Sequence, residues 1–145
     1  MAFPEPVPGL VIRYSYLWQD EHKRGREEGV KDRPCAVILV TKNEDDEKVV
    51  TVLPITHTPP ADPQLAVEIP TLVKRRLGLD DERSWIVLTE ANRFIWPGPD
   101  LRPSTLGDSA SVTYGALPFA LFENIRTKFI AAIRARRAGM VPRSE

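Results

Sequence analysis

The chain has 145 residues with 20 basic and 20 acidic side chains, so its formal net charge at pH 7 is zero. Its composition, 42% hydrophobic and 28% charged, is that of one globular domain, and it lacks the run of about 18 apolar residues that a membrane span needs. A single cysteine, Cys35, excludes an internal disulfide and favours a reducing cytoplasm. Two histidines and one cysteine are too few for a zinc site of the usual kind, and 14 prolines exclude a long helical bundle.

Strand signals dominate the first two thirds of the chain. Leu10–Leu17 alternates apolar and polar residues, and Pro34–Thr41 is a continuous apolar run, typical of a strand buried on both faces. Lys48–Ile55 is rich in β-branched residues, and we expect it to pair antiparallel with the preceding strand across a solvated acidic turn at 44–47. Further short elements are predicted as strands at Leu65–Ile69, Trp85–Thr89 and Arg93–Trp96, and as a helix at Thr71–Leu77 that stops at Gly78.

In the last part of the chain the spacing of apolar residues changes from that of a strand to that of a helix. From Pro118 onward, apolar residues recur at helical spacing, and Gly139 is expected to end the helix after about 20 residues. The apolar face consists of Phe122, Ile125, Phe129, Ala132 and Ile133. A basic last turn complements the helix dipole. Many short strands followed by one amphipathic helix predict an α+β, mainly β fold, such as a small barrel capped by a helix.

A polar loop of about 15 residues separates the first two strands, which is long for a compact domain and typical of a functional segment. Its basic residues, among them Arg24, Arg26 and Lys31, can follow a phosphate backbone, although acidic residues are interspersed with them. Arg33 directly precedes Pro34 and a buried strand, so we expect its guanidinium to be fixed at the rim of the sheet. A fixed guanidinium can bind a phosphate, and the alternative is a structural ion pair.

Polar side chains also emerge where later strands end. Thr56 and His57 close the third strand before Pro59, and histidine is suited to general acid–base catalysis, although a lone histidine is more often structural. Glu90 and Arg93 either pair with each other or face the same groove as Arg33 and Thr56. Exposed tryptophans can stack on unpaired bases, whereas buried ones belong to the core; the candidates are Trp18 and Trp96.

Read in order, these fragments resemble the PemK/MazF/Kid family of growth-inhibiting toxins. The resemblance covers roughly residues 9–135 and rests on a set of short motifs with the family's order and spacing. The motifs are Gly9 with the strand Leu10–Leu17, Gly29 to Arg33-Pro34 with Cys35–Val40, Pro54-Ile55-Thr56, Val87 to Glu90 with Arg93, and the terminal helix.

The resemblance implies an SH3-like antiparallel β-barrel with a C-terminal amphipathic helix, over residues 9–139, between an N-terminal extension (1–8) and a C-terminal tail (140–145). It implies a homodimeric, cytoplasmic endoribonuclease that cleaves single-stranded RNA without metal or cofactor and is neutralised by a cognate antitoxin. In the family's pattern Arg33 and Thr56 are catalytic, and we predict His57 as an additional acid or base. Substrate binding is predicted for Arg24, Arg26, Lys31, Glu90 and Arg93.

Three positions depart from the family's pattern. Arg26 stands where some members have a catalytic histidine, Leu88 where some have an arginine, and His57 where a serine or threonine is usual. The departures at Arg26 and Leu88 favour an alternative: a non-catalytic protein on the same barrel, either a protein-binding module or a toxin that arrests growth by binding a protein target. A zinc or dinucleotide enzyme is disfavoured, because the chain lacks the usual ligands and a glycine-rich turn.

Overall fold

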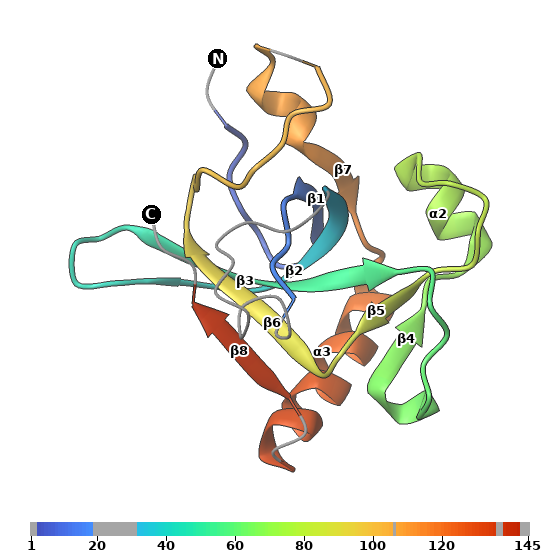
Figure 1. The fold of residues 1–145 in the computed structure, drawn as a ribbon. Helices are drawn as coiled ribbons and strands as arrows, with labels where there is room; N and C mark the ends of the chain where they lie inside the picture. The colour runs from blue at the N-terminus through green and yellow to red at the C-terminus, as the bar shows by residue number, and fades with distance from the viewer. Residues whose placement is uncertain (1–2, 19–31, 106, 136–137, 143–145) are drawn as a thin grey trace.

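The computed structural model describes residues 3–18, 32–105, 107–135 and 138–142, and its main feature is a mostly antiparallel sheet of eight strands (Figure 1). The mainly β, α+β class predicted from the sequence is therefore confirmed. Strands β4 and β7 end the main path through the sheet and do not pair with each other among these residues. The strands are β1 (Leu10–Tyr14), β2 (Arg33–Lys42), β3 (Lys48–Thr56), β4 (Ala66–Glu68), β5 (Trp85–Val87), β6 (Glu90–Ile95), β7 (Thr113–Ala116) and β8 (Gly139–Pro142).

The long hairpin of β2 and β3 is the centre of the sheet (Figure 1). Its predicted acidic turn is confirmed: the Asn43 side-chain oxygen accepts hydrogen bonds from the backbone N–H groups of Asp45 and Glu47, at 3.0 and 2.9 Å. On its other edge β3 pairs first with β6 and then, near its C-terminal end, with β5. The end of β3 therefore lies between two neighbouring strands, which fixes the backbone at Thr56.

Two apolar clusters cover the two faces of the sheet. On one face Ile125 and Phe129 of helix α3 (Phe119–Arg134) pack against strand residues such as Leu53. The other face buries Tyr14 and Phe94, whose rings stack with their centroids 4.7 Å apart. None of the helices in the described ranges is long and apolar enough to cross a membrane.

Both α-helices begin where the sequence predicts, but only α2 also ends there. Helix α2 (Thr71–Leu77) has the predicted bounds and ends at Gly78, whose φ of 71° is the left-handed conformation that glycine adopts at low cost. Helix α3 begins after Pro118 as expected, but the prediction that it runs to Gly139 is wrong, because it ends at Arg134. Two short 3₁₀ helices, η1 (Pro63–Leu65) and η2 (Ser109–Val112), complete the fold.

Strand β8 is an element that the sequence analysis did not predict. It begins at Gly139 and pairs in parallel with β6, opposite Glu90 to Arg93 (Figure 1). Residues 140–142 thus belong to the sheet, and the domain extends past the boundary placed at residue 139. A four-residue strand that contains a glycine and a proline has too little apolar alternation to be recognised in sequence.

Candidate functional site

The register of the β2–β3 hairpin brings together two residues that are 23 positions apart in sequence. Cys35 lies opposite Pro54 in this hairpin. Two residues further along each strand, the same register leads to Arg33 and Thr56, and residues that face each other in this way share one side of a sheet. Both side chains line the same pocket.

Arg33 is held by contacts on two sides of its guanidinium. Its Nη1 donates a 3.4 Å hydrogen bond to the carbonyl oxygen of Ile55, the residue before Thr56. Its Cζ lies 4.8 Å from the centre of the Trp18 ring, a cation–π distance. The Nε atom of Arg33 is buried and has no hydrogen-bond partner among the described residues. The sequence expectation of a fixed guanidinium at the rim is thus met, with an aromatic ring and a backbone carbonyl as its partners.

The pocket has a volume of about 540 Å³ and opens at the end of β3. Besides Arg33 and Thr56 it combines hydroxyl and apolar groups with a carboxylate, Asp62. The Thr56 Oγ1 atom accepts a 3.2 Å hydrogen bond from the Thr58 backbone N–H, which turns the chain and leaves the hydroxyl hydrogen without an acceptor among the described residues. The remaining lining residues are Trp18, Thr58, Pro59, Pro60, Ala61, Leu65, Ala66, Val87 and Thr89.

A buried polar network supports the Trp18 side of the pocket. Asn92, which is fully buried on β6, accepts a 2.9 Å hydrogen bond from the Leu17 N–H and donates one of 2.8 Å to the Leu17 carbonyl. The Tyr16 hydroxyl donates to Glu90 at 3.2 Å, and its ring packs edge-on against Trp18 at 5.2 Å. Burial, together with the nearby Glu90 carboxylate, raises the pKa of Tyr16 far above its usual value, so this hydroxyl remains a donor.

Glu90 therefore supports the pocket through Tyr16 rather than lining it, which is a role that the sequence analysis did not foresee. Asn92 was also missed. It lies just before the predicted strand Arg93–Trp96, whereas the observed strand β6 already begins at Glu90 and buries Asn92 in its middle, where a polar side chain needs a specific partner. The partner itself, the backbone of Leu17, lies 75 residues away and is not visible in the sequence.

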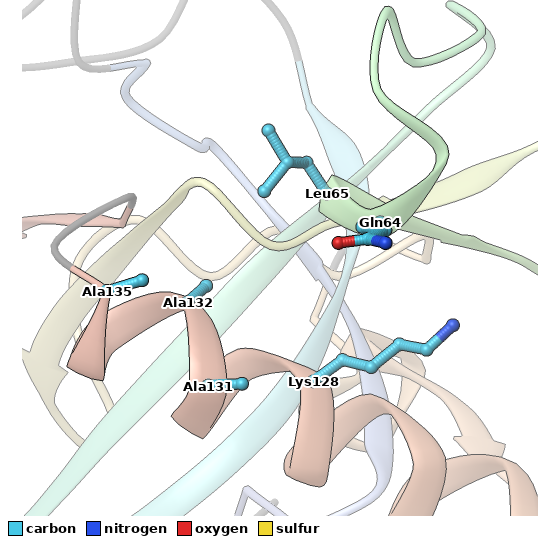
Figure 2. Close-up of a pocket in the computed structure, with 6 residues that line it drawn as sticks. All are labelled: Gln64, Leu65, Lys128, Ala131, Ala132 and Ala135. Atoms are coloured by element: carbon cyan, nitrogen blue, oxygen red, sulfur yellow. The ribbon is translucent and has the colours of Figure 1, made fainter.

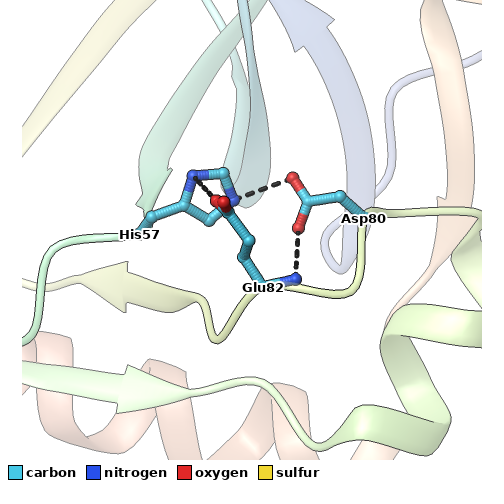
Figure 3. A group of neighbouring side chains, drawn as sticks. All are labelled: His57, Asp80 and Glu82. Atoms are coloured by element: carbon cyan, nitrogen blue, oxygen red, sulfur yellow. Dashed lines mark hydrogen bonds and ion pairs between the residues drawn. The ribbon is translucent and has the colours of Figure 1, made fainter.

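His57 is not among the residues that line this pocket, so the structure does not place the predicted additional acid or base with Arg33 and Thr56. Thr56 is the last residue of β3, whereas His57 lies in the bend that follows it. Its Nε2 lies 2.8 Å from Asp80 Oδ2 and its Nδ1 lies 3.0 Å from Glu82 Oε2 (Figure 3).

The other predicted substrate-binding residues lie elsewhere. Arg93 is exposed on β6 and lines a different pocket with Lys42, Asn43 and Val49, so the structure does not place it beside Arg33 and Thr56. Arg24, Arg26 and Lys31 fall outside the described residues.

A second pocket, of about 450 Å³, lies between α3 and η1 (Figure 2). Leu65 lines both pockets, so the two are neighbours. The wall that α3 contributes consists of Ala131, Ala132 and Ala135 with the stem of Lys128, and Gln64 faces it from η1. Alanines, one amide and one amine provide space but no evident nucleophile or acid–base pair, so the Arg33 pocket is the better candidate for chemistry.

No family model matches this chain, and no curated protein matches it. The functional interpretation therefore rests on the geometry of the Arg33 pocket and on the motifs that the sequence analysis identified.

Proposed function

We propose that this chain is an endoribonuclease toxin of a type II toxin–antitoxin pair, which cleaves single-stranded RNA in the Arg33 pocket. One observation carries the proposal: Arg33 and Thr56, the two residues that the PemK/MazF/Kid resemblance marks as catalytic, line one pocket. The Nη1–Ile55 hydrogen bond ties the guanidinium to the peptide group that precedes Thr56. A cation and a hydroxyl on adjacent positions are groups that can hold a phosphodiester.

In the proposed reaction the ribose 2′-oxygen attacks the adjacent phosphorus. A bond from the 2′-oxygen to phosphorus forms and the bond to the 5′-oxygen breaks, which gives a cyclic phosphate and a 5′-hydroxyl end. The proton lost by the 2′-hydroxyl is balanced by one gained by the 5′-oxygen. Arg33 stabilises the negative charge that develops on the phosphoryl oxygens, and Thr56 donates a hydrogen bond to one of them.

The walls of the pocket suit an unpaired nucleotide. Trp18 is half-buried at the pocket's edge and can stack on a base, and Pro59 and Pro60 supply a rigid apolar surface. A double helix hides its base faces, so a pocket of this kind selects single-stranded RNA. The cation–π contact between Arg33 and Trp18 would couple binding of the base to the position of the guanidinium.

The proposal includes the further features that the resemblance implies: an SH3-like barrel topology, a homodimer, action in the cytoplasm, and inhibition by an antitoxin that covers the RNA groove. Cys35 is a buried thiol that forms no disulfide within the described residues, which is compatible with a reducing compartment.

The test is incubation of purified protein with mixed RNA in the presence of EDTA. We expect cleavage products with 5′-hydroxyl ends from the wild type and none above background from Arg33→Ala. Arg126→Ala is the matched control, because Arg126 is an exposed arginine that pairs only with Glu123 on α3 in the described structure. Intact RNA with correctly folded wild-type protein would favour the non-catalytic, protein-binding alternative instead.

A further inference from the structure

A second group of side chains, which could hold a metal ion, lies near the end of β3 and outside the Arg33 pocket. His57, Asp80 and Glu82 each offer one ligand atom, and these atoms all lie within 4.8 Å of one another (Figure 3). His57 follows β3, whereas the two carboxylates come from the segment between α2 and β5. All three side chains are about half exposed or more, so a solvated ion can reach them.

The arrangement of Asp80 is fixed from behind by a buried lysine. The Lys74 side chain is only 5% exposed, and its Nζ donates a 2.9 Å hydrogen bond to Asp80 Oδ1 and another to the Glu82 carbonyl oxygen. The Glu82 N–H also donates to Asp80 Oδ1, at 3.1 Å. These donors occupy Oδ1 and leave Oδ2 directed at the imidazole. Such supporting contacts orient metal ligands in proteins.

A neutral His57 ring cannot donate a hydrogen bond to both carboxylates. A neutral imidazole has one N–H and one lone pair, yet a carboxylate oxygen lies within about 3 Å of each ring nitrogen. One carboxylate then faces a lone pair, which is unfavourable unless a cation lies between them. A metal ion bound to one ring nitrogen and to the carboxylates supplies such a cation.

We propose that His57, Asp80 and Glu82 form a binding site for a divalent transition metal, Zn²⁺ in particular. An imidazole with two carboxylates is a donor set that zinc accepts and that magnesium, which prefers oxygen ligands alone, does not. With zinc–ligand bonds of about 2.0 Å, tetrahedral ligand atoms lie about 3.3 Å apart. The 2.8 Å separation of Nε2 and Oδ2 needs to widen only slightly, and the exposed Glu82 side chain can turn inward.

The metal would be structural. It would connect the end of β3 to the segment after α2, and none of its three ligands lines the Arg33 pocket. The site is therefore independent of the proposed RNA cleavage, which is tested in EDTA. A loss of metal binding and a loss of cleavage are separate results.

The experiment measures zinc binding by the untagged full chain, freed of metal and then dialysed against Zn²⁺ alone at pH 7.5. We expect one zinc per chain, an increase in the thermal unfolding midpoint on zinc addition, and no comparable effect of Mg²⁺. His57→Ala and Asp80→Asn should each weaken zinc binding at least about tenfold and abolish the increase in midpoint. Far-UV circular dichroism verifies that both variants are folded.

The controls use the same residue types outside the site. His22→Ala removes the chain's other histidine, and Asp81→Asn removes the carboxylate between the two proposed ligands. Both should bind zinc as the wild type does. The proposal is overturned if the wild type takes up no zinc, if His57→Ala binds it unchanged, if His22→Ala abolishes binding, or if Mg²⁺ binds equally well. The first result would mean that the three side chains only contact one another and bind no metal.

Discussion

Thr56 and His57 are neighbours in sequence, yet they belong to two different regions of the molecule. Thr56 faces a pocket with Arg33 and Trp18, where the groups are a cation, a hydroxyl and an aromatic ring. His57 faces Asp80 and Glu82, where the groups are an imidazole and two carboxylates. The difference arises where β3 ends: Thr56 is its last residue and pairs opposite Trp85, whereas His57 lies in the bend that follows. Adjacent motif residues at a strand end therefore cannot be assumed to share a site.

The largest effect on RNA cleavage is expected from a substitution in the Arg33 pocket. Arg33→Ala should lower RNA cleavage at least about 100-fold, because the developing phosphoryl charge loses its fixed cation. His57→Ala should lower it less than about threefold, since this ring does not line the pocket. Initial rates on one labelled single-stranded RNA measure both. A loss in His57→Ala as large as that in Arg33→Ala would mean that His57 and the Arg33 pocket act as one site.

A smaller loss is expected when the Thr56 hydroxyl is removed, together with its hydrogen bond from the Thr58 N–H. Thr56→Val keeps the shape of the side chain and should reduce cleavage about tenfold, through a higher barrier for the chemical step. The matched variant Thr58→Val changes a neighbouring pocket residue whose side chain has no part in the proposed reaction. Equal rates for the two variants would argue against a role for the Thr56 hydroxyl.

The Asn92–Leu17 hydrogen bonds beside the pocket can be tested by measuring the free energy of unfolding. Asn92→Ala removes both hydrogen bonds to Leu17 and leaves a buried N–H and carbonyl without these partners, so the free energy of unfolding should fall by about 1–3 kcal/mol. Urea denaturation measures this change. Asn43→Ala is a control in the exposed β2–β3 turn and should cost less than Asn92→Ala. The reverse order would show that the Leu17 contact contributes little.

The smallest effect is confined to alkaline pH. The pKa of Tyr16 is raised in the folded protein, whereas an unfolded tyrosine ionises near pH 10. The folded state therefore binds one proton more above about pH 10, and stability should fall there as pH rises, by up to about 1.4 kcal/mol per pH unit for this one group. Below that pH the contribution is fully present. Tyr16→Phe should flatten this decline in urea denaturation measured between pH 9 and 11, and an unchanged slope would contradict it.

The sequence predicts most of the central sheet because its hairpin signals are local. The acidic turn and the continuous apolar run at Pro34–Thr41 both correspond to observed elements, and the pairing of β2 with β3 follows from them. The parallel pairing of β8 with β6 is not predictable in this way, since it joins segments 49 positions apart without a turn signal.

At the candidate sites, too, some neighbouring residues are predictable from the sequence and others are not. Arg33 and Thr56 are predictable because one hairpin register brings them together. The partners of His57 are not, since Asp80 and Glu82 reach it through a separate segment held by the buried Lys74. A charged run in sequence is usually a solvated surface, and only tertiary contacts distinguish such a run from a binding site.

The most direct test of the account is the structure of the protein with a short 2′-O-methyl RNA, which binds but cannot be cleaved by 2′-oxygen attack. We predict that one bridging phosphate lies within about 3 Å of both the Arg33 guanidinium and Thr56 Oγ1, and that the His57 ring does not contact this phosphate. An RNA strand bound elsewhere, for example across Arg93 and Lys42, with no phosphate near Arg33, would contradict it.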